Sequence, residues 1–431
     1  MNNMNLRERD KKNVWHPFTQ VSSAAAPIPI VKAEGAYFYD ENGKRYIDAI
    51  ASWWVNVHGH CHPYLSKKIA EQLQTLEHAI FSGFTHEPAV QLAERLLKRL
   101  PENHSRIFYS DNGSTAVEVA LKMAFQFWSN KEIPKLKVIA FENAYHGDTF
   151  GGMSVGARNA FNHPFTQLLF DVIHIPVPLK GKESHVLKEL KKAIAKKDVA
   201  AFIFEPLIQG AGGMVMYPAE ILDEMIGLCR ENEVLTIADE VMTGFGRTGK
   251  FFACDHLENK PDIICLSKGL TGGVMPLGVT SCAEFIFEAF VSDDKMKTFF
   301  HGHSYTGNPT ACSAALASMD LFDQPEAVEN MKRIERKHLE FFEKIREHKV
   351  LSDVRALGTI IAFEVLTKEE TGYMNSLSDD ISNFFIERGI ILRPLGNVMY
   401  ILPPYCISDE DLEYIYNSIE EFLEAYSGSE L

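Results

Sequence analysis

The sequence lacks paired cysteines, long apolar runs and an apolar leader, and each absence excludes a class of protein. Its seven cysteines in 431 residues are scattered and never spaced as Cys-x-x-Cys, so neither a disulfide framework nor a zinc ribbon is indicated. No apolar run approaches the length of a membrane span, and residues 1–13 contain no apolar core of a signal peptide. We therefore expect a cytoplasmic protein that does not insert into a membrane.

Basic residues are also in short supply. Lysine and arginine number 43 against 58 aspartates and glutamates, which gives a formal net charge of −15. They form only short pairs, such as Lys67 with Lys68, so nucleic acid and anionic membranes are poor partners. Hydrophobic residues make up 46% of the chain, which is ample for a large core, and the length favours two or three domains.

The strongest local signal for chemistry lies in residues 234–271. Two short apolar runs, 234–238 and 263–266, are bounded by charged and glycine-rich segments, as buried parallel strands are. Asp239 closes the first run and Lys268 follows the second. An acid and an amine at the carboxyl ends of neighbouring strands would face the same crevice of an open α/β sheet.

This pairing suits a pyridoxal phosphate enzyme, which needs a lysine to hold the aldehyde as a Schiff base and an acid beside the ring nitrogen. Two ordinary interpretations compete with it. An aspartate after a strand is commonly a cap or turn residue, and most lysines are solvated. The two residues alone do not decide between these interpretations.

The segment GFGRTGK, residues 244–250, resembles two nucleotide-binding motifs but fits neither. It contains GxGxxG and the first seven positions of a P-loop, which would make the chain a nucleotide-hydrolysing protein. The P-loop needs serine or threonine after the lysine, whereas Phe251 follows here, and residues 240–243 separate the motif from the preceding strand. We predict a tight loop.

Residues 110–115, SDNGST, lie between an expected strand at 106–109 and an expected helix from Ala116. Free backbone N–H groups and the positive end of the helix would both point at this turn. Helix capping alone would explain the sequence. The alternative is a phosphate bound by the amides of Gly113 and Ser114.

The segment SWWVNVHGHCHP, residues 52–63, suggests either an aromatic substrate wall or a metal site. Adjacent tryptophans are usually core residues, although one of a pair at a turn is often exposed. A zinc site draws further ligands and an orienting carboxylate from elsewhere, and no second cluster of suitable spacing is visible. His301 and His303 are the nearest candidates, and we expect no metal.

Six segments together resemble the class III, pyridoxal-phosphate-dependent aminotransferases of fold type I, over nearly the whole chain. They are SDNGSTAVEVALKMA, NAYHGDTFGGMSVG, FEPLIQGAGGM, IADEVMTGFGRTGK, LSKGLTGG and HSYTGNPTACSAALA. The resemblance implies an α/β fold with a large domain, 61–324, built on a mostly parallel central sheet. A smaller α+β domain would combine residues 1–60 with residues 325–431, where a long charged helix marks a change of character.

The same resemblance assigns roles to individual residues. Lys268 would form the Schiff base and shuttle the proton, Asp239 would partner the pyridinium nitrogen, and Tyr145 would stack on the ring. Ser304 stands where the family brings a hydroxyl to the phosphate from the neighbouring subunit, which implies a homodimer with its active site at the interface. Intact Lys268 and Asp239 count against a non-catalytic binding protein on this fold.

Within that class, WHPFTQ, SWWVNVHGHCHP and LRPLGNVMYILPPY resemble the branch that aminates 8-amino-7-oxononanoate in biotin biosynthesis. Trp53 would offer an apolar wall for the aliphatic chain and Arg393 a fork for its carboxylate. Phe18 and Gly302 complete the expected substrate contacts.

Two positions leave the amino donor of this branch open. Phe18 replaces a tyrosine of the adenosylmethionine-using form, and His303 replaces an expected proline. The donor is therefore S-adenosylmethionine or lysine. The alternative activity is that of another class III ω-aminotransferase, acting on ornithine, 4-aminobutyrate or lysine.

Overall fold

The chain is built around a seven-stranded sheet in the order β4-β12-β11-β10-β7-β5-β6. The structure, a computed structural model, describes residues 4–159 and 161–427. Neighbouring strands are parallel except at β12, which is antiparallel to both of its neighbours. The strands are β4 (His104–Ser110), β5 (Lys137–Phe141), β6 (Val172–Ile175), β7 (Val199–Phe204), β10 (Leu235–Asp239), β11 (Ile263–Leu266) and β12 (Gly278–Ala283).

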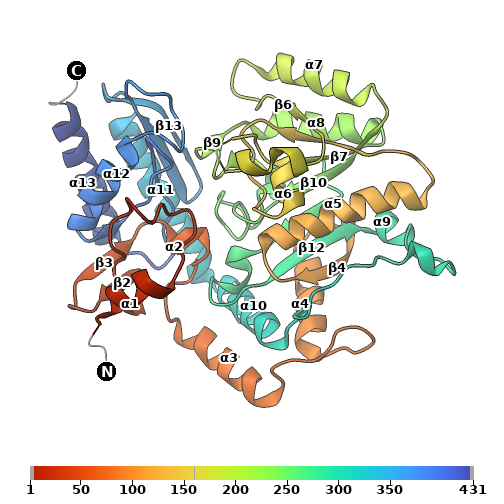
Figure 1. Ribbon diagram of the computed structural model, residues 1–431, viewed down its shortest axis with the longest axis horizontal. Helices are drawn as coiled ribbons and strands as arrows, with labels where there is room; N and C mark the ends of the chain where they lie inside the picture. Colours follow the sequence, from red (N-terminus) through yellow and green to blue (C-terminus); the bar gives the residue numbers. More distant parts are fainter. Residues whose placement is uncertain (1–3, 160, 428–431) are drawn as a thin grey trace.

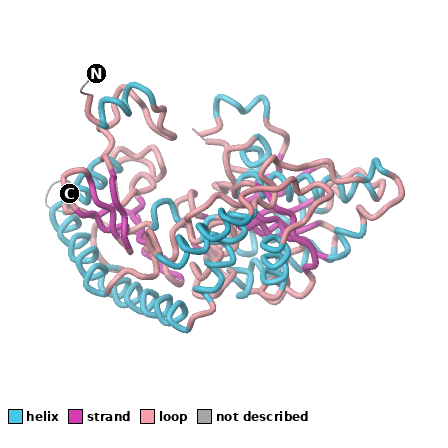
Figure 2. Tube along the Cα trace, turned by 90° about the horizontal axis from the view of Figure 1, so that it is seen from below, coloured by secondary structure: helices cyan, strands magenta, loops and turns pink. Residues whose placement is uncertain are grey.

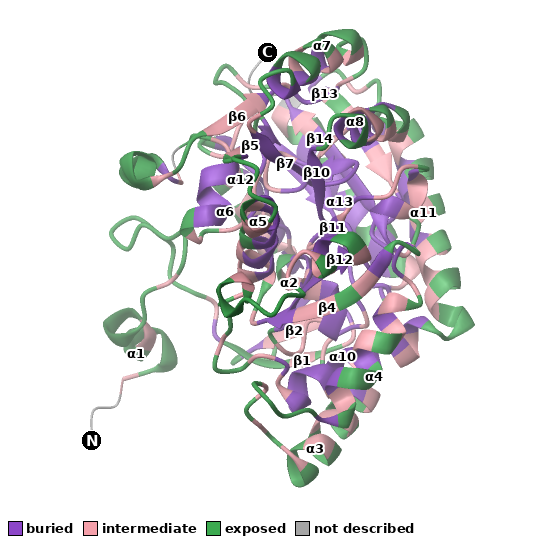
Figure 3. Cartoon of the chain, turned by 90° about the vertical axis from the view of Figure 1, so that its right-hand side faces the viewer, coloured by how far each residue is buried: buried purple, intermediate pink, exposed green. Residues whose placement is uncertain are grey.

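The middle strands are apolar because helices cover both faces of the sheet. Every residue of β7, β10 and β11 is buried, as expected for near-continuous hydrophobic strands of a parallel sheet. Figure 3 shows these strands as the buried centre of the molecule, with exposed helix faces around them. The main covering helices are α5 (Gly113–Asn130), α7 (Glu183–Ile194) and α8 (Ala219–Glu231).

The two ends of the chain share a second sheet, in the order β1-β2-β3-β15. The C-terminal strand β15 pairs in parallel with β3, so that Ile390 lies opposite Ile47. Figure 1 shows the N-terminal strands beside the C-terminal helices, and Figure 2 shows the strands in two separate groups. This shared sheet supports the expected grouping of both termini in one domain, although the boundaries at residues 60 and 324 stay a prediction. The sheet consists of β1 (Ile30–Glu34), β2 (Tyr37–Asp40), β3 (Arg45–Asp48) and β15 (Ile390–Ile391).

A three-stranded antiparallel sheet, β13-β14-β16, completes the C-terminal part. The long charged helix expected after Gln324 is α11 (Pro325–Ile345). The other elements here are β13 (Leu351–Leu357), β14 (Ile360–Val365), α12 (Leu377–Glu387), β16 (Val398–Ile401) and α13 (Asp409–Ser427).

Shorter elements surround these sheets, and α10 (Pro309–Phe322) packs against α3 and α4. No helix among the described residues combines the length and apolarity needed to cross a lipid bilayer. The remaining helices are α1 (Leu6–Asn13), α2 (Ala51–Trp54), α3 (Pro63–Thr75), α4 (Glu87–Leu97), α6 (Phe150–Val155) and α9 (Glu284–Glu288). The short hairpin is β8 (Ile208–Gln209) with β9 (Val215–Met216), and the 3₁₀ turns are η1 (His163–Leu168), η2 (Ala253–His256), η3 (Lys268–Thr271) and η4 (Lys295–Lys297).

Candidate active site

A cavity of about 770 Å³ opens at the carboxyl ends of the parallel strands. Open α/β sheets bind their ligands at this edge. Seven of the residues singled out from the sequence line the cavity: Phe18, Trp53, Gly113, Ser114, Tyr145, Asp239 and Lys268. The structure therefore brings the acid, the amine and the turn at residues 110–115 to one cavity.

Neighbouring strands deliver Asp239 and Lys268, as predicted. Asp239 is the last residue of β10 and lies opposite Cys265 of β11, three residues before Lys268. Burial lowers the pKa of the Lys268 amine to about 8, although the carboxylates of Asp239 and Glu205 act in the opposite direction. Near pH 7 a larger share of the Lys268 amine is therefore neutral than in a solvated lysine, and the neutral form is the one that can accept a proton.

The Asp239 carboxylate is oriented by a residue to which the sequence pattern gave no role. Nδ1 of His146 lies 2.8 Å from Oδ2 of Asp239, and the Val241 amide donates to Oδ1. Because a carboxylate only accepts hydrogen bonds, Nδ1 of His146 carries the hydrogen. His146 is buried, and its place after Tyr145 in the YHG segment was the only sequence signal for it.

A second buried carboxyl group, Glu205, directly follows β7. It accepts hydrogen bonds from the backbone amides of Tyr145 at 3.0 Å and Gly210 at 2.8 Å. Burial raises the pKa of Glu205 to about 7. Glu205 therefore fixes the backbone of Tyr145, whose ring faces the cavity.

The turn at residues 110–115 caps the start of α5, and this cap leaves room for the expected anion site. Asn112 caps the helix by accepting from the Thr115 amide at 2.9 Å. The amides of Gly113 and Ser114 belong to the first helical turn, where the helix offers no acceptor. A side chain on Gly113 would meet Val241 at 2.6 Å, so only glycine keeps this turn open. The hydroxyls of Ser114 and Thr149 lie 2.9 Å apart beside it.

Aromatic side chains from distant segments close the other end of the cavity. The ring of Phe18 contacts Trp53 at 5.5 Å and Phe161 at 5.7 Å, and Phe161 contacts Tyr373 at 4.6 Å between centroids. The Arg393 guanidinium lies 4.4 Å from the Trp53 ring and donates to the Tyr373 hydroxyl at 3.3 Å. Sequence reasoning missed Phe161 and Tyr373, because no local pattern marks them.

The adjacent tryptophans divide as the sequence suggested. Trp53 is 38% exposed, whereas Trp54 is 4% exposed. Nearby histidines have protein partners: His60 contacts Asp48 at 2.8 Å, and His58 contacts the Ser318 hydroxyl at 2.9 Å. Among the residues that the structure describes, no group of three or more His, Cys, Asp or Glu side chains is arranged to hold a metal ion.

Gly302 and Ser304 lie outside this cavity. Both are exposed, in the surface loop before α10. His301 and His303 of the same loop contact each other through their Nε2 atoms at 3.1 Å. The chain by itself therefore does not bring Gly302 or Ser304 to its own Lys268.

Comparisons with known proteins identify the family of this chain. The model of the aminotransferase class-III family matches residues 18–423. The adenosylmethionine-8-amino-7-oxononanoate aminotransferase of Synechococcus elongatus is 47% identical over 420 residues, covering 96% of this chain and 98% of that relative. The enzyme of the same name from Methanocaldococcus jannaschii is 36% identical over 450 residues, covering 97% of each.

Solved structures of aminotransferases share the fold of this chain. The crystal structure of the M. jannaschii enzyme superposes with a TM-score of 0.93 at 35% identity, over 97% of this chain and 98% of that one. An amine transaminase from an uncultivated Pseudomonas species, solved in its PLP-bound form, gives a TM-score of 0.88 at 31% identity, over 95% of this chain and 97% of that one. The expected fold type I architecture is therefore confirmed.

Proposed function

The chain belongs to the aminotransferase class-III family, and from that membership we propose that it aminates 8-amino-7-oxononanoate to 7,8-diaminononanoate in biotin biosynthesis. It is a pyridoxal-phosphate-dependent aminotransferase. The observation that carries the proposal is the cavity in which Lys268 and Asp239 meet an aromatic rim with Arg393 beside it. Relatives named for this reaction match nearly the full chain at 36–47% identity.

The residues present fit the cofactor. Gly113 and Ser114 offer free amides at a helix start for the phosphate, and Tyr145 offers a ring on the cavity wall. When bound, pyridoxal phosphate supplies an aldehyde that takes up the amino group and a ring that stores electrons. Asp239, oriented by His146, would hold a proton at the ring nitrogen. Lys268 would carry a proton through Nζ, because its lowered pKa lets it accept and release one near neutral pH.

The aromatic rim would orient the substrate. Trp53 and Phe18 provide an apolar wall, and the planar Arg393 guanidinium suits a terminal carboxylate in bidentate fashion. Gly302 lies outside the cavity of its own chain, so its expected substrate contact would be made in the site of a neighbouring protomer. Phe18 provides no hydroxyl, so S-adenosylmethionine and lysine both remain candidate donors, to be separated by experiment.

Two further assignments extend this proposal. We infer a homodimer in which Ser304 of one protomer reaches the cofactor phosphate of the other, since Ser304 is exposed and does not line the cavity of its own chain. We also propose a cytosolic location, because the seven scattered cysteines, two of them exposed, are all free.

The test is to follow the visible absorption of the bound cofactor in two half-reactions. S-adenosylmethionine or L-lysine, added separately, should bleach the band, and 8-amino-7-oxononanoate should restore it. We would then assign the compound that bleaches the band, S-adenosylmethionine or L-lysine, as the amino donor of this enzyme. Failure of the oxononanoate to restore a bleached band would overturn the biotin assignment in favour of a general ω-aminotransferase. Omega-transaminases of 26–29% identity are among the structural neighbours.

A further inference from the structure

The turn that carries the two tryptophans is strained. Ala51, Ser52 and Trp54 adopt positive φ angles of 50°, 60° and 67°. Such angles are unfavourable for residues other than glycine. A turn with three of them within four residues persists only where surrounding contacts stabilise it.

One set of stabilising contacts converges on Asp48, whose side chain is fully buried. Its carboxylate accepts from the Ser52 amide at 2.7 Å and lies 2.8 Å from Nε2 of His60. The Asn56 side chain receives a hydrogen bond from the Gly59 amide on Oδ1, so its Nδ2 faces Nδ1 of His60 at 3.1 Å. The polarity is therefore fixed: Asn56 donates to His60, and His60 donates to Asp48.

A second set comes from Arg247, in the GFGRTGK segment whose nucleotide-binding motifs fail on sequence context. Arg247 is 1% exposed and donates to the carbonyl of Pro403 at 2.8 Å, of Asn56 at 3.3 Å and of Trp54 at 3.5 Å. A buried guanidinium that donates to three carbonyls stabilises the backbone on which they lie. Arg247 therefore fixes the end of the strained turn.

The outcome of these contacts is the placement of Trp54. Its indole N–H donates to the Tyr400 hydroxyl at 3.0 Å, and its ring centroid lies 4.6 Å from Nζ of Lys268. At this distance the ring face attracts a protonated amine. Trp53, the preceding residue, instead contacts Phe18 and Arg393 at the rim.

We propose that Trp54 is a positioning residue for Lys268: the lock formed by Asp48, His60, Asn56 and Arg247 holds its ring so that it keeps the free amine in the cavity. This role rests on the proposed function of Lys268 and deepens it. The charged groups that face Lys268 are Asp239, Glu205 and Arg247, and Trp54 adds an attraction for the protonated amine to them.

The test measures the titration of the Lys268 amine in protein loaded with pyridoxamine phosphate. In that form the lysine is not bonded to the cofactor. Trace acetic anhydride labels amines only in their neutral form, so labelling of the Lys268 peptide against pH, read by mass spectrometry, reports its titration. Trp54→Leu should move the midpoint down by roughly half a unit to one unit, since a cation–π contact of about 1 kcal/mol is lost. Trp54→Phe keeps a ring face beside the amine, so its labelling midpoint should stay close to that of the wild-type protein.

Matched variants separate positioning from general damage. Trp53→Leu removes the neighbouring tryptophan and should leave the midpoint unchanged. His60→Phe keeps the ring packed on Phe38 but cannot donate to Asp48, and should shift the midpoint in the same direction as Trp54→Leu. If Trp54→Leu does not fold, Trp54→Met takes its place.

Two results would overturn the proposal. An unchanged or raised midpoint in the Trp54 variant contradicts the positioning role, and an unchanged midpoint in His60→Phe contradicts the lock. Labelling needs no substrate, so failure of the oxononanoate reaction would leave this measurement intact. A protein that does not bind pyridoxamine phosphate would refute the proposed function first.

Discussion

Lys268 is the residue at which burial and charge oppose each other most directly. Burial lowers the pKa of its amine from 10.5 to about 8 while Asp239 and Glu205 favour the charged form. At pH 7.5 a pKa of 8 leaves roughly a quarter of the amine neutral, against about one part in a thousand at 10.5. The cavity therefore makes an ordinary lysine usable as a base.

The first prediction separates Lys268 from the lysine of GFGRTGK. Lys268→Ala should abolish measurable transamination, because it removes both the cofactor attachment and the proton carrier. Lys250→Ala should leave turnover unchanged, since Lys250 is exposed and its hydrogen bond within the described part of the chain goes to the carbonyl of Asp255. The measurement is the initial rate of transamination by each variant, with whichever donor bleaches the cofactor band of the wild-type protein.

Substantial transamination by Lys268→Ala would refute the assignment of the catalytic lysine. A loss confined to Lys250→Ala, together with ATP binding by the wild-type protein, would instead favour the nucleotide-hydrolysing interpretation of that segment.

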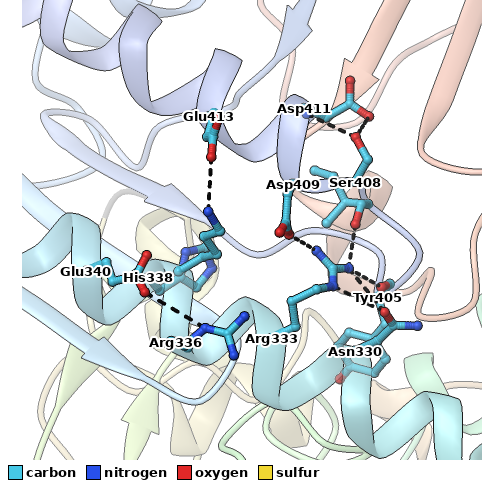
Figure 4. Close-up of polar contacts among 12 residues, drawn as sticks. Asn330, Arg333, Arg336, His338, Glu340, Tyr405, Ser408, Asp409, Asp411 and Glu413 are labelled. Carbon is cyan, nitrogen blue, oxygen red and sulfur yellow. Dashed lines mark hydrogen bonds and ion pairs between the residues drawn. The ribbon is translucent and has the colours of Figure 1, made fainter.

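At the scale of elements, one arginine joins helix α11 to the segment that leads into α13. Figure 4 shows Arg333 pointing from α11 toward residues 405–409. It forms an ion pair with Asp409 at 2.6 Å and donates to the carbonyl of Ile407 at 2.6 Å and of Tyr405 at 3.3 Å. The Tyr405 amide in turn donates to the Val57 carbonyl beside the strained turn. Arg333 therefore stabilises the backbone segment that contacts the tryptophan turn, although it does not line the cavity itself.

We predict that Arg333→Ala lowers the free energy of unfolding by roughly 1–3 kcal/mol, because two backbone carbonyls lose their donor. Arg336, three residues later on α11, is the matched control. Its ion pair is with Glu340, at 3.8 Å and largely exposed, so Arg336→Ala should cost about 0.5 kcal/mol or less. Urea denaturation of the three proteins tests this difference, and equal losses would contradict it.

Across the whole molecule, prediction from sequence succeeded where a signal is local. The runs that form β10 and β11 are apolar, and an ionisable residue stands at or just after the end of each, so their place and their shared edge could be inferred from the residues alone. Phe161 and Tyr373 join the cavity from loops far apart in the chain, and neither carries a motif. The contact between His146 and Asp239 depends on how two strands are spaced, which no residue pattern encodes.

The expected dimer predicts complementation between two inactive variants. Lys268→Ala and Ser304→Glu should each be nearly inactive, the second because an added carboxylate repels the phosphate. Refolded together in equal amounts, they should recover roughly a quarter of the wild-type activity, since half of the dimers contain one intact site. Sedimentation should show twice the 48.6 kDa of one chain.

Recovery fails if Ser304 serves its own subunit, because neither protomer of a mixed dimer would then supply a complete site. Activity of Ser304→Glu alone at the wild-type level would also refute the assigned role of this residue.

The pairing of β15 with β3 has a consequence for the time course of biosynthesis. Strand β3, and the tryptophan turn that follows it, leave the ribosome about 340 residues before the strand that completes their sheet. At 5–20 residues per second that interval is roughly 20 to 70 seconds. Throughout that interval the hydrogen-bonding edge of β3 lacks its partner strand, and chaperones have a defined period in which to bind it.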